Sequence, residues 1–379
     1  MEDAGQSRGE NETVAGRRQS AVWGRRVPSV GTCSLTEEVT GIMPCRSKTL
    51  KLAAAVLLLL LSLAAPALAV QDKKGEKDAP VGLPVLWRAP DDLPARDLFL
   101  GPGGEALKPD LSSLKFESDE TGGYSVKWNV RDGSGKKWAA KLGREAQAET
   151  AAVRLMWAVG YMTEVNYLVP CAHIVNAPKP RKEVERCAGD GFRNVRLKSK
   201  PEGEKTVGNW SWKDNPFLRT KEFGGLLVMM ALLNNWDLKE ENNKILYAPA
   251  GEGRRAELRY AVTDLGASFG KVKVNAPVLW RIMRNRNDPE DYAGDHFLEE
   301  VKGGRVYLFY RGKQGELFDD IGVDEARWIG GLLAKLSDRQ IEDAFRAANY
   351  TPEEVRLLAG AVRERINELL SVGGPTSSR

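Results

Sequence analysis

Alternation of apolar and polar residues predicts a small sheet in the first half of the chain. Apolar side chains occupy every second position from residue 124 to residue 130, as in a strand with one buried face. Residues 132–135, Asp-Gly-Ser-Gly, predict a hairpin turn, and residues 137–141 predict the returning strand. Further short strands are expected at residues 172–175 and 194–197.

A helix is expected directly after this hairpin. Residues 145–159 carry apolar side chains at helical spacing, and Gly160 is a natural terminator. The residues expected on the apolar face are Ala152, Leu155, Met156 and Val159. Together with the strands, this helix predicts an N-terminal lobe over residues 111–200 that consists of a small antiparallel sheet and one helix.

The second half of the chain has mainly helical patterns. Residues 223–233 predict a helix that is buried on most faces. Two strands are expected after it, at residues 245–247 and 258–262. Near the C-terminus two helices each begin with a capping box, at residues 337–340 and 351–354. The sequence therefore predicts an α+β protein whose second lobe is the larger and mainly helical one.

The N-terminal part predicts export from the cytoplasm. A short positive region begins at Met43, an apolar run follows over residues 52–65, and Ala67-Leu-Ala69 is an A-x-A site. Residues 43–69 are therefore expected to be a signal peptide that is cleaved after Ala69. The alternative is a membrane anchor, but the run is shorter than the roughly 20 apolar residues that span a bilayer. Residues 1–42 are polar and aperiodic, which predicts a disordered tail or a true start at Met43.

Composition removes several classes of function. The formal net charge is +4 over 379 residues, and basic and acidic residues are interleaved, so no basic face for nucleic acid is expected. The chain has only two histidines, His173 and His296, which argues against a His-rich zinc site and against a Ser-His-Asp triad. We expect His173 to be a core residue. Residues 70–110 are rich in Lys, Asp, Pro and Gly and predict a linker.

Three further features keep two interpretations each. Cys171 and Cys187 would remain after cleavage, and an oxidising compartment permits them to pair, but their sequence positions leave open whether they do. The aromatic segment 208–217 favours core packing over stacking on a ligand. Residues 284–296, RNRNDPEDYAGDH, favour a solvated loop over a substrate loop, and we assign them no role.

A set of polar residues in a fixed order indicates phosphoryl transfer. That reaction needs a cation on the phosphates, carboxylate and amide ligands for a metal ion, and a base for the attacking hydroxyl. Lys141 ends a predicted strand, and Glu149 follows it in the next helix. Asp237 and Asn242 have the spacing D-x-x-x-x-N, and Asp264-Leu-Gly ends a later strand.

With these motifs, residues 111–370 resemble the protein-kinase-like superfamily, and within it the atypical HipA-type and phosphoinositide-kinase-like groups. By this resemblance the chain folds into a small lobe, residues 111–200, and a larger lobe, residues 201–379. Residues 235–243, NWDLKEENN, are similar to the catalytic loop H-R-D-L-K-x-x-N, with Asn and Trp in place of His and Arg. Residues 149–160 also resemble the first helix of the HipA-type group.

The resemblance implies a role for each polar residue. Asp237 would be the catalytic base, and Lys239 would neutralise the transferring phosphoryl group. Lys141 would bind the nucleotide phosphates. The metal ligands would be Asn242 and Asp264. The partner of Lys141 would be Glu149, with Glu145 as the alternative. In place of a full G-x-G-x-x-G motif, the nearby glycines are Gly122, Gly123, Gly133 and Gly135.

Three hypotheses of function follow. The first is an exported atypical kinase that uses Mg²⁺ or Mn²⁺ and ATP to phosphorylate a hydroxyl-bearing protein or small molecule. It would have no nucleic-acid partner and would contact a membrane only through an uncleaved signal peptide. The second is a catalytically inactive pseudokinase that binds a nucleotide or a partner at the cell surface. The third is a secreted structural protein in which the Asp and Asn residues only cap turns.

Overall fold

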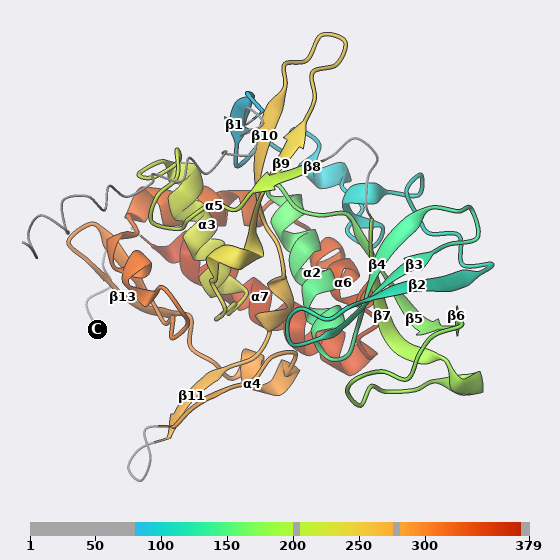
Figure 1. Cartoon of the computed structure of the whole chain (residues 1–379). Coiled ribbons are helices and arrows are strands. Elements are labelled where there is room, and N and C mark those ends of the chain that lie inside the picture. The colour runs from blue at the N-terminus through green and yellow to red at the C-terminus, as the bar shows by residue number, and fades with distance from the viewer. Residues whose placement is uncertain (1–79, 200–204, 276–280, 373–379) are drawn as a thin grey trace, which may run out of the picture. The chain divides into compact units, whose positions relative to one another are not determined.

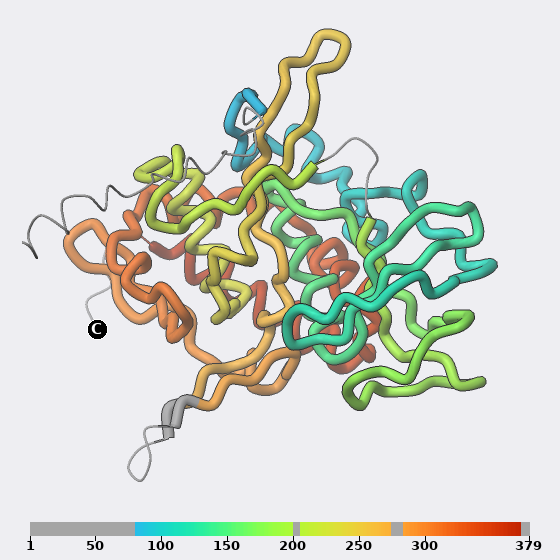
Figure 2. The backbone as a smooth tube through the Cα atoms, viewed as in Figure 1, coloured from blue at the N-terminus to red at the C-terminus, as the bar shows by residue number. Residues whose placement is uncertain are grey.

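Strands dominate the first half of the described chain, and helices dominate its C-terminal part (Figure 1). The structure is a computed structural model, and it describes residues 80–199, 205–275 and 281–372. The expected signal peptide, residues 43–69, and the segment 1–42 lie outside the described residues. The chain is an α+β protein, and its course from the strands to the helices can be followed in Figure 2.

The first half forms a six-stranded sheet. Its strand order is β5 (Asn166–Ala172), β7 (Phe192–Ser199), β4 (Lys137–Leu142), β3 (Val126–Arg131), β2 (Leu114–Glu120) and β6 (Ile174–Val175). Neighbouring strands are antiparallel except β2 and β6, which are parallel. The two strands of the expected hairpin, β3 and β4, pair as predicted, and Lys127 lies opposite Lys141. The exposed Tyr124 precedes β3 and is not part of it.

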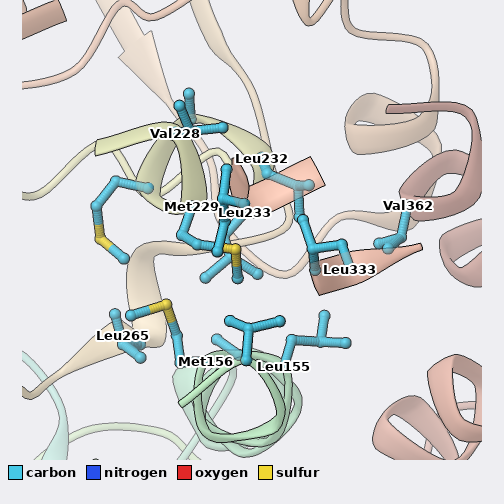
Figure 3. Packing of buried hydrophobic residues seen from close by; sticks show 14 of the residues in the cluster. Leu155, Met156, Val228, Met229, Leu232, Leu233, Leu265, Leu333 and Val362 are labelled. Carbon is cyan, nitrogen blue, oxygen red and sulfur yellow. The ribbon is translucent and has the colours of Figure 1, made fainter. Parts of the chain in front are cut away.

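Helix α2 (Glu145–Ala158) follows β4 and ends one residue before the predicted boundary. Gly160, next but one after it, has φ of 98°, a left-handed conformation that glycine adopts without strain. Buried apolar residues of α2 pack against the helices of the C-terminal part. Figure 3 shows Leu155 and Met156 of α2 pointing toward Met229 and Leu233 at the end of α3 (Lys221–Leu232).

The C-terminal part is helical around this core. Its other helices are α4 (Pro289–Ala293), α5 (Val323–Leu333), α6 (Asp338–Arg346) and α7 (Pro352–Ser371). Both expected capping boxes are present, Ser337 with Gln340 at α6 and Thr351 with Glu354 at α7. Residues 208–217 contribute to the same core, since Trp210 and Trp212 are buried in it.

The C-terminal part contains more strand than expected. A second sheet has the order β1 (Leu83–Val85), β10 (Glu257–Val262), β9 (Asn243–Ala248) and β8 (Lys205–Gly208). Two hairpins pair β11 (Val272–Asn275) with β12 (Arg281–Arg284) and β13 (Leu298–Lys302) with β14 (Arg305–Leu308). Short 3₁₀ turns complete the elements: η1 (Leu93–Ala95), η2 (Gly101–Gly103), η3 (Ala188–Asp190), η4 (Glu240–Asn242), η5 (Leu265–Ala267) and η6 (Gly315–Asp320).

The expectation of an unstructured linker is wrong for the described part of residues 70–110. Leu86, Leu93 and Leu98 are buried in the same core as α2 and α3. Gln340 of α6 donates a side-chain hydrogen bond to the Leu93 carbonyl at 3.0 Å. Strand β1 adds this segment to the second sheet. The composition of this segment, with its Pro and Gly residues, resembles that of a linker, but its buried leucines anchor it to the core.

Two other expectations are corrected. His173 is exposed, because it lies in the connection between β5 and β6 and not in a buried strand. Residues 284–296 are not a solvated loop, since Tyr292 is fully buried and Asp295 pairs with Lys271 at 2.9 Å. The question of the cysteines is resolved, because Cys171 and Cys187 form a disulfide. Within the three described stretches, no helix is long and apolar enough to span a membrane.

Candidate functional site

The loop 234–242 leaves helix α3 through a defined helix end. Asn234 has φ of 51°, and its N–H donates to the Ala231 carbonyl at 2.9 Å. The N–H of Asn235 donates to the Met230 carbonyl, also at 2.9 Å. These two bonds and the left-handed residue form a Schellman motif, for which Asn is the common alternative to Gly. The first Asn of the sequence NNWD thus ends the helix and turns the chain toward Asp237.

Two segments that are distant in sequence hold this loop in place. The Trp236 indole N–H donates to the Asn285 carbonyl at 2.8 Å. The Tyr310 hydroxyl donates to the Asn235 carbonyl at 2.9 Å, and the backbone N–H of Lys313 donates to the Trp236 carbonyl at 2.9 Å. Such anchors on both sides of Trp236 fix the backbone next to the Asp237 side chain.

Asp237 lies between two ammonium groups. One carboxylate oxygen is 3.0 Å from the Nζ of Lys239, and the other is 2.7 Å from the Nζ of Lys313. The side-chain hydrogen bond with Asp237 raises the pKa of Lys239. Asn242 closes the loop, because its amide Nδ2 donates to the Asp237 backbone carbonyl at 3.1 Å.

Asn242 also connects the loop to the Asp-Leu-Gly segment. Its carbonyl accepts hydrogen bonds from the N–H and the hydroxyl of Thr263, at 2.8 and 2.7 Å. The next residue, Asp264, has a left-handed backbone with φ of 56° and begins η5. Gly266 is needed at its position, since a Cβ there would lie 2.7 Å from the Cβ of Glu145. This close approach places Asp264 beside the first turn of α2.

Lys141 is the centre of an ionic cluster. Its ammonium is 2.6 Å from Glu149, 2.5 Å from Asp264 and 3.5 Å from Glu145. The lysine side chain is 1% exposed. Both partners considered for Lys141 are present, and Glu149 is the closer one. Glu149 also pairs with Arg196 of β7 at 2.6 Å.

The cluster shifts the ionisation of its members. Burial alone would lower the pKa of Lys141, but the carboxylates of Glu149 and Asp264 outweigh it and raise that pKa well above its usual range. Burial alone would raise the pKa of Asp264, but Lys141 and Lys127 hold it well below its usual range. The pKa of Glu145 is lowered too, because Lys141 and a hydrogen bond from Ser125 overcome its burial. All three groups are therefore charged at neutral pH.

These elements enclose a cavity of about 890 Å³. All six residues predicted from the sequence line it, namely Lys141, Glu149, Asp237, Lys239, Asn242 and Asp264. The structure therefore brings the six predicted residues together in one cavity. The chemical role of each residue stays a prediction.

Several lining residues were missed by sequence reasoning. Seven of them are cationic, and these include Lys127, Arg196, Arg284, Arg286 and Lys313. Lys127 could have been found, because it lies opposite Lys141 across the predicted hairpin. Lys313 and Arg286 belong to distant segments and carry no local signal that links them to Asp237 or Glu145.

The oxygen donors at the site suit a hard cation such as Mg²⁺, but only as a partial set. Asp264 offers a carboxylate and Asn242 an amide oxygen, which are ligand types that Mg²⁺ accepts. Among the described residues, no group of three or more His, Cys, Asp or Glu side chains could hold a metal ion. A metal ion would therefore fit here with phosphate oxygens completing its ligands, as is common for Mg²⁺ in nucleotide sites.

Comparisons with known proteins add a distant structural likeness. No family model matches the sequence, and no curated protein matches it significantly. Among solved structures, the chain is similar to the proinflammatory kinase CtkA of Helicobacter pylori, with a TM-score of 0.38 and 11% sequence identity. The match covers 68% of this chain and 97% of that one.

Proposed function

We propose that this protein is an atypical kinase that transfers the γ-phosphoryl group of ATP to a hydroxyl acceptor. The observation that supports the proposal is the convergence on one cavity of Lys141, Asp237 and Asp264, which come from β4, the loop after α3 and the turn after β10. Phosphoryl transfer depends mainly on positioning and on charge stabilisation, and the cavity offers both.

Each side chain has a role in this proposal. Lys141, oriented by Glu149, binds the phosphates of the nucleotide. Asp264 and Asn242 hold Mg²⁺ or Mn²⁺, which when bound neutralises charge on the phosphate oxygens. Asp237 orients the acceptor hydroxyl and accepts its proton, and Lys239 stabilises the negative charge of the transferred group.

Nucleotide entry requires a rearrangement within the Lys141 cluster. The ammonium of Lys141 contacts Asp264 directly at 2.5 Å. Phosphates bound by Lys141 would compete with Asp264 for its ammonium, and Asp264 would then be free to help hold the metal ion. The pair of Lys141 with Glu149, at 2.6 Å, can persist and keep the ammonium oriented.

One observation favours a second candidate, a pseudokinase that binds nucleotide without turnover. Each oxygen of the Asp237 carboxylate faces an ammonium, from Lys239 and from Lys313. An acceptor hydroxyl would have to share the Asp237 carboxylate with these two ammonium groups.

A series of variants tests the proposal and separates the two candidates. In the wild type, Mg²⁺-ATP is expected to raise the thermal unfolding temperature. At a ligand concentration 100 times Kd, the free energy of unfolding should increase by about 2.7 kcal/mol. Asp264→Asn should lose this effect, while the exposed Asp214→Asn should keep it. Asp237→Asn should keep nucleotide binding and lose at least about 100-fold in the rate of ATP turnover.

The outcomes are distinct. Binding without any turnover in the wild type assigns the pseudokinase function. No stabilisation of the wild type by ATP with Mg²⁺ or Mn²⁺ contradicts both candidates and leaves a secreted structural protein.

Export is part of the same proposal. The disulfide between Cys171 and Cys187 is of a kind that persists in oxidising compartments, which supports a periplasmic or extracellular location. N-terminal sequencing of the mature protein should begin at Val70, after cleavage following Ala69. A mature protein that retains Met43 would contradict cleavage at this site.

A further inference from the structure

The turn between β2 and β3 is held from outside the cavity by a second segment. We call residues 121–125, Thr-Gly-Gly-Tyr-Ser, the glycine turn, and residues 176–187, which follow β6, the strap. Gly122, Gly123, Tyr124 and Ser125 all line the cavity. The strap residues that contact the turn do not line the cavity, so the strap supports the turn from its outer side.

Two cationic side chains of the strap bind the carbonyl groups of the turn. The Nη2 of Arg181 donates to the carbonyl oxygens of Gly123 at 3.2 Å and of Ser125 at 2.5 Å. Its Nη1 donates to the carbonyl of Thr121.

Lys182 binds one of the two carbonyls of the turn that Arg181 leaves. Its Nζ donates to the Tyr124 carbonyl at 2.6 Å and lies 3.5 Å from the centroid of the Tyr124 ring. Four of the five carbonyl groups of the turn therefore accept a hydrogen bond from the strap.

This pattern orients the peptide groups of the turn. The C=O and N–H of a trans peptide point in opposite directions. Carbonyls that point to the strap therefore direct the following N–H groups, those of Gly122, Tyr124 and Ser125, toward the opposite side. Successive backbone N–H groups on one side of a turn form an anion-binding concavity. The side chain of Ser125 adds an inner anchor, because its hydroxyl donates to Glu145.

The strap is itself fixed at both ends. At its start, β6 pairs with β2, the strand that leads into the glycine turn. At its end, Cys187 forms the disulfide with Cys171 of β5, 16 positions earlier. Arg181 and Lys182 are exposed, and exposed ionic hydrogen bonds contribute little when their partners move freely. The disulfide keeps the strap close to the turn. The individually weak hydrogen bonds from Arg181 and Lys182 can therefore hold the turn in place.

We propose that Arg181 is a positioning residue for nucleotide binding, and that the Cys171–Cys187 disulfide is what keeps it in place. Arg181 acts through the glycine turn and does not contact the nucleotide itself. This inference rests on the proposed function, because it assigns the turn to the phosphates of the same nucleotide. It adds a structural reason for the disulfide that the site residues alone do not provide.

Four variants of the full chain test this inference by isothermal titration with Mg²⁺-ATP. Arg181→Gln should weaken nucleotide binding about five- to tenfold, because it removes three charge-assisted bonds to exposed carbonyls. Arg181→Lys should recover part of the loss. The double variant Cys171→Ser/Cys187→Ser should weaken binding by a similar factor. Lys179→Gln is the matched control, because Lys179 is exposed on the same strap and makes no hydrogen bond or ion pair with any described residue.

Two readouts separate positioning from general stability. Where ATP turns over, Arg181→Gln should raise KM for ATP while kcat changes less than about twofold, since the turn binds ATP and its transition state alike. In the nucleotide-free protein, hydrogen exchange at residues 122–125 should accelerate in Arg181→Gln and in the double cysteine variant, but not in Lys179→Gln. The triple variant that combines Arg181→Gln with both cysteine changes should bind nucleotide only slightly more weakly than Arg181→Gln alone. The reason is that both changes act through the same strap.

The possible failures are distinguishable. If the wild type does not bind Mg²⁺-ATP or Mn²⁺-ATP, both the proposed function and this inference are wrong. If the wild type binds and Asp264→Asn does not, but Arg181→Gln binds as tightly as Lys179→Gln, only this inference is wrong. Additive losses from the arginine and cysteine changes would also overturn it, since they would show independent effects.

Discussion

At the scale of single residues, Lys141 shows how a buried charge persists in this protein. Its side chain has almost no contact with solvent, and Glu149 and Asp264 provide the interactions that water would otherwise supply. A buried cation of this kind is tolerated only when it is paired, because desolvation alone would favour the neutral amine. The stability of this part of the site therefore depends on keeping both signs of charge.

Replacing the cation alone should be costly. Lys141→Met removes the ammonium that Glu149 and Asp264 share and leaves only Arg196 and Lys127 as counter-charges. We expect a loss of about 3 kcal/mol in the free energy of unfolding measured by urea titration. Lys137→Met, an exposed change on the same strand, should stay within about 0.5 kcal/mol. Adding Glu149→Gln to Lys141→Met should recover part of the loss. Equal losses from Lys141→Met and Lys137→Met would contradict the importance of the pair.

Local sequence was sufficient to predict six polar residues that line one cavity, and it was insufficient for the residues around them. Asp237 and Asn242 were predicted from their spacing within one loop, and Asp264 was predicted from the short Asp-Leu-Gly motif. Lys313 was missed because its contact with Asp237 spans 76 positions that share no pattern. The same reason applies to Arg286, which pairs with Glu145 across the cavity.

At the scale of elements, the contact between η5 and α2 decides where Asp264 lies. Gly266 faces Glu145 so closely that no side chain fits between them. Packing against Glu145 is thus a sufficient reason for a glycine at this position of the Asp-Leu-Gly segment. Strand β2 was missed at this scale, because only Leu114 of its seven residues is buried and the alternation is absent. The segment 80–110 was misjudged because composition outweighed its few buried leucines.

Two glycine substitutions test this interpretation in opposite directions. Gly266→Ala should destabilise the protein by about 1–3 kcal/mol, because the new methyl group must push η5 from α2, and it should weaken Mg²⁺-ATP binding. Gly360→Ala is exposed within α7 and meets no atom within 4 Å, so it should stabilise by about 0.5–1 kcal/mol. Thermal unfolding with and without nucleotide measures both. Unchanged binding in Gly266→Ala would mean that η5 does not need this position.

At the scale of the whole described unit, the two larger apolar cores are joined by polar contacts. The six-stranded sheet has its own cluster of buried apolar side chains, and α2 belongs to the larger helical cluster. Buried ionic and polar groups connect α2 to the sheet. Glu149 pairs with Lys141 and Arg196, and Arg154 donates to the side-chain oxygen of Asn166 at 3.0 Å. The Lys141–Glu149–Arg196 part of the joint between the cores therefore belongs to the candidate site.

This arrangement makes the coupling of the two cores dependent on pH. The folded-state pKa values of Asp264 and Glu145 are lowered, so their contribution is full above the unfolded value near 4 and is lost progressively as pH falls from there through the lower folded values. The pKa of Lys141 is raised, so its contribution is full below the unfolded value near 10.4 and is lost only as pH rises through the higher folded value. Between about pH 5 and pH 10 the joint is fully charged.

We expect the two cores to unfold together at pH 7 and to separate near pH 3. Hydrogen exchange, corrected for intrinsic rates, should give one protection level for residues 114–199 and 323–371 at neutral pH. Near pH 3 the sheet should lose protection first, because its apolar cluster is the smaller of the two. Asp264→Asn should show a weaker dependence on acid, because one titrating carboxylate is absent, whereas Asp214→Asn should follow the wild type. Equal protection of both segments at pH 3 would show that apolar packing, rather than the ionic network around Lys141, joins the two cores.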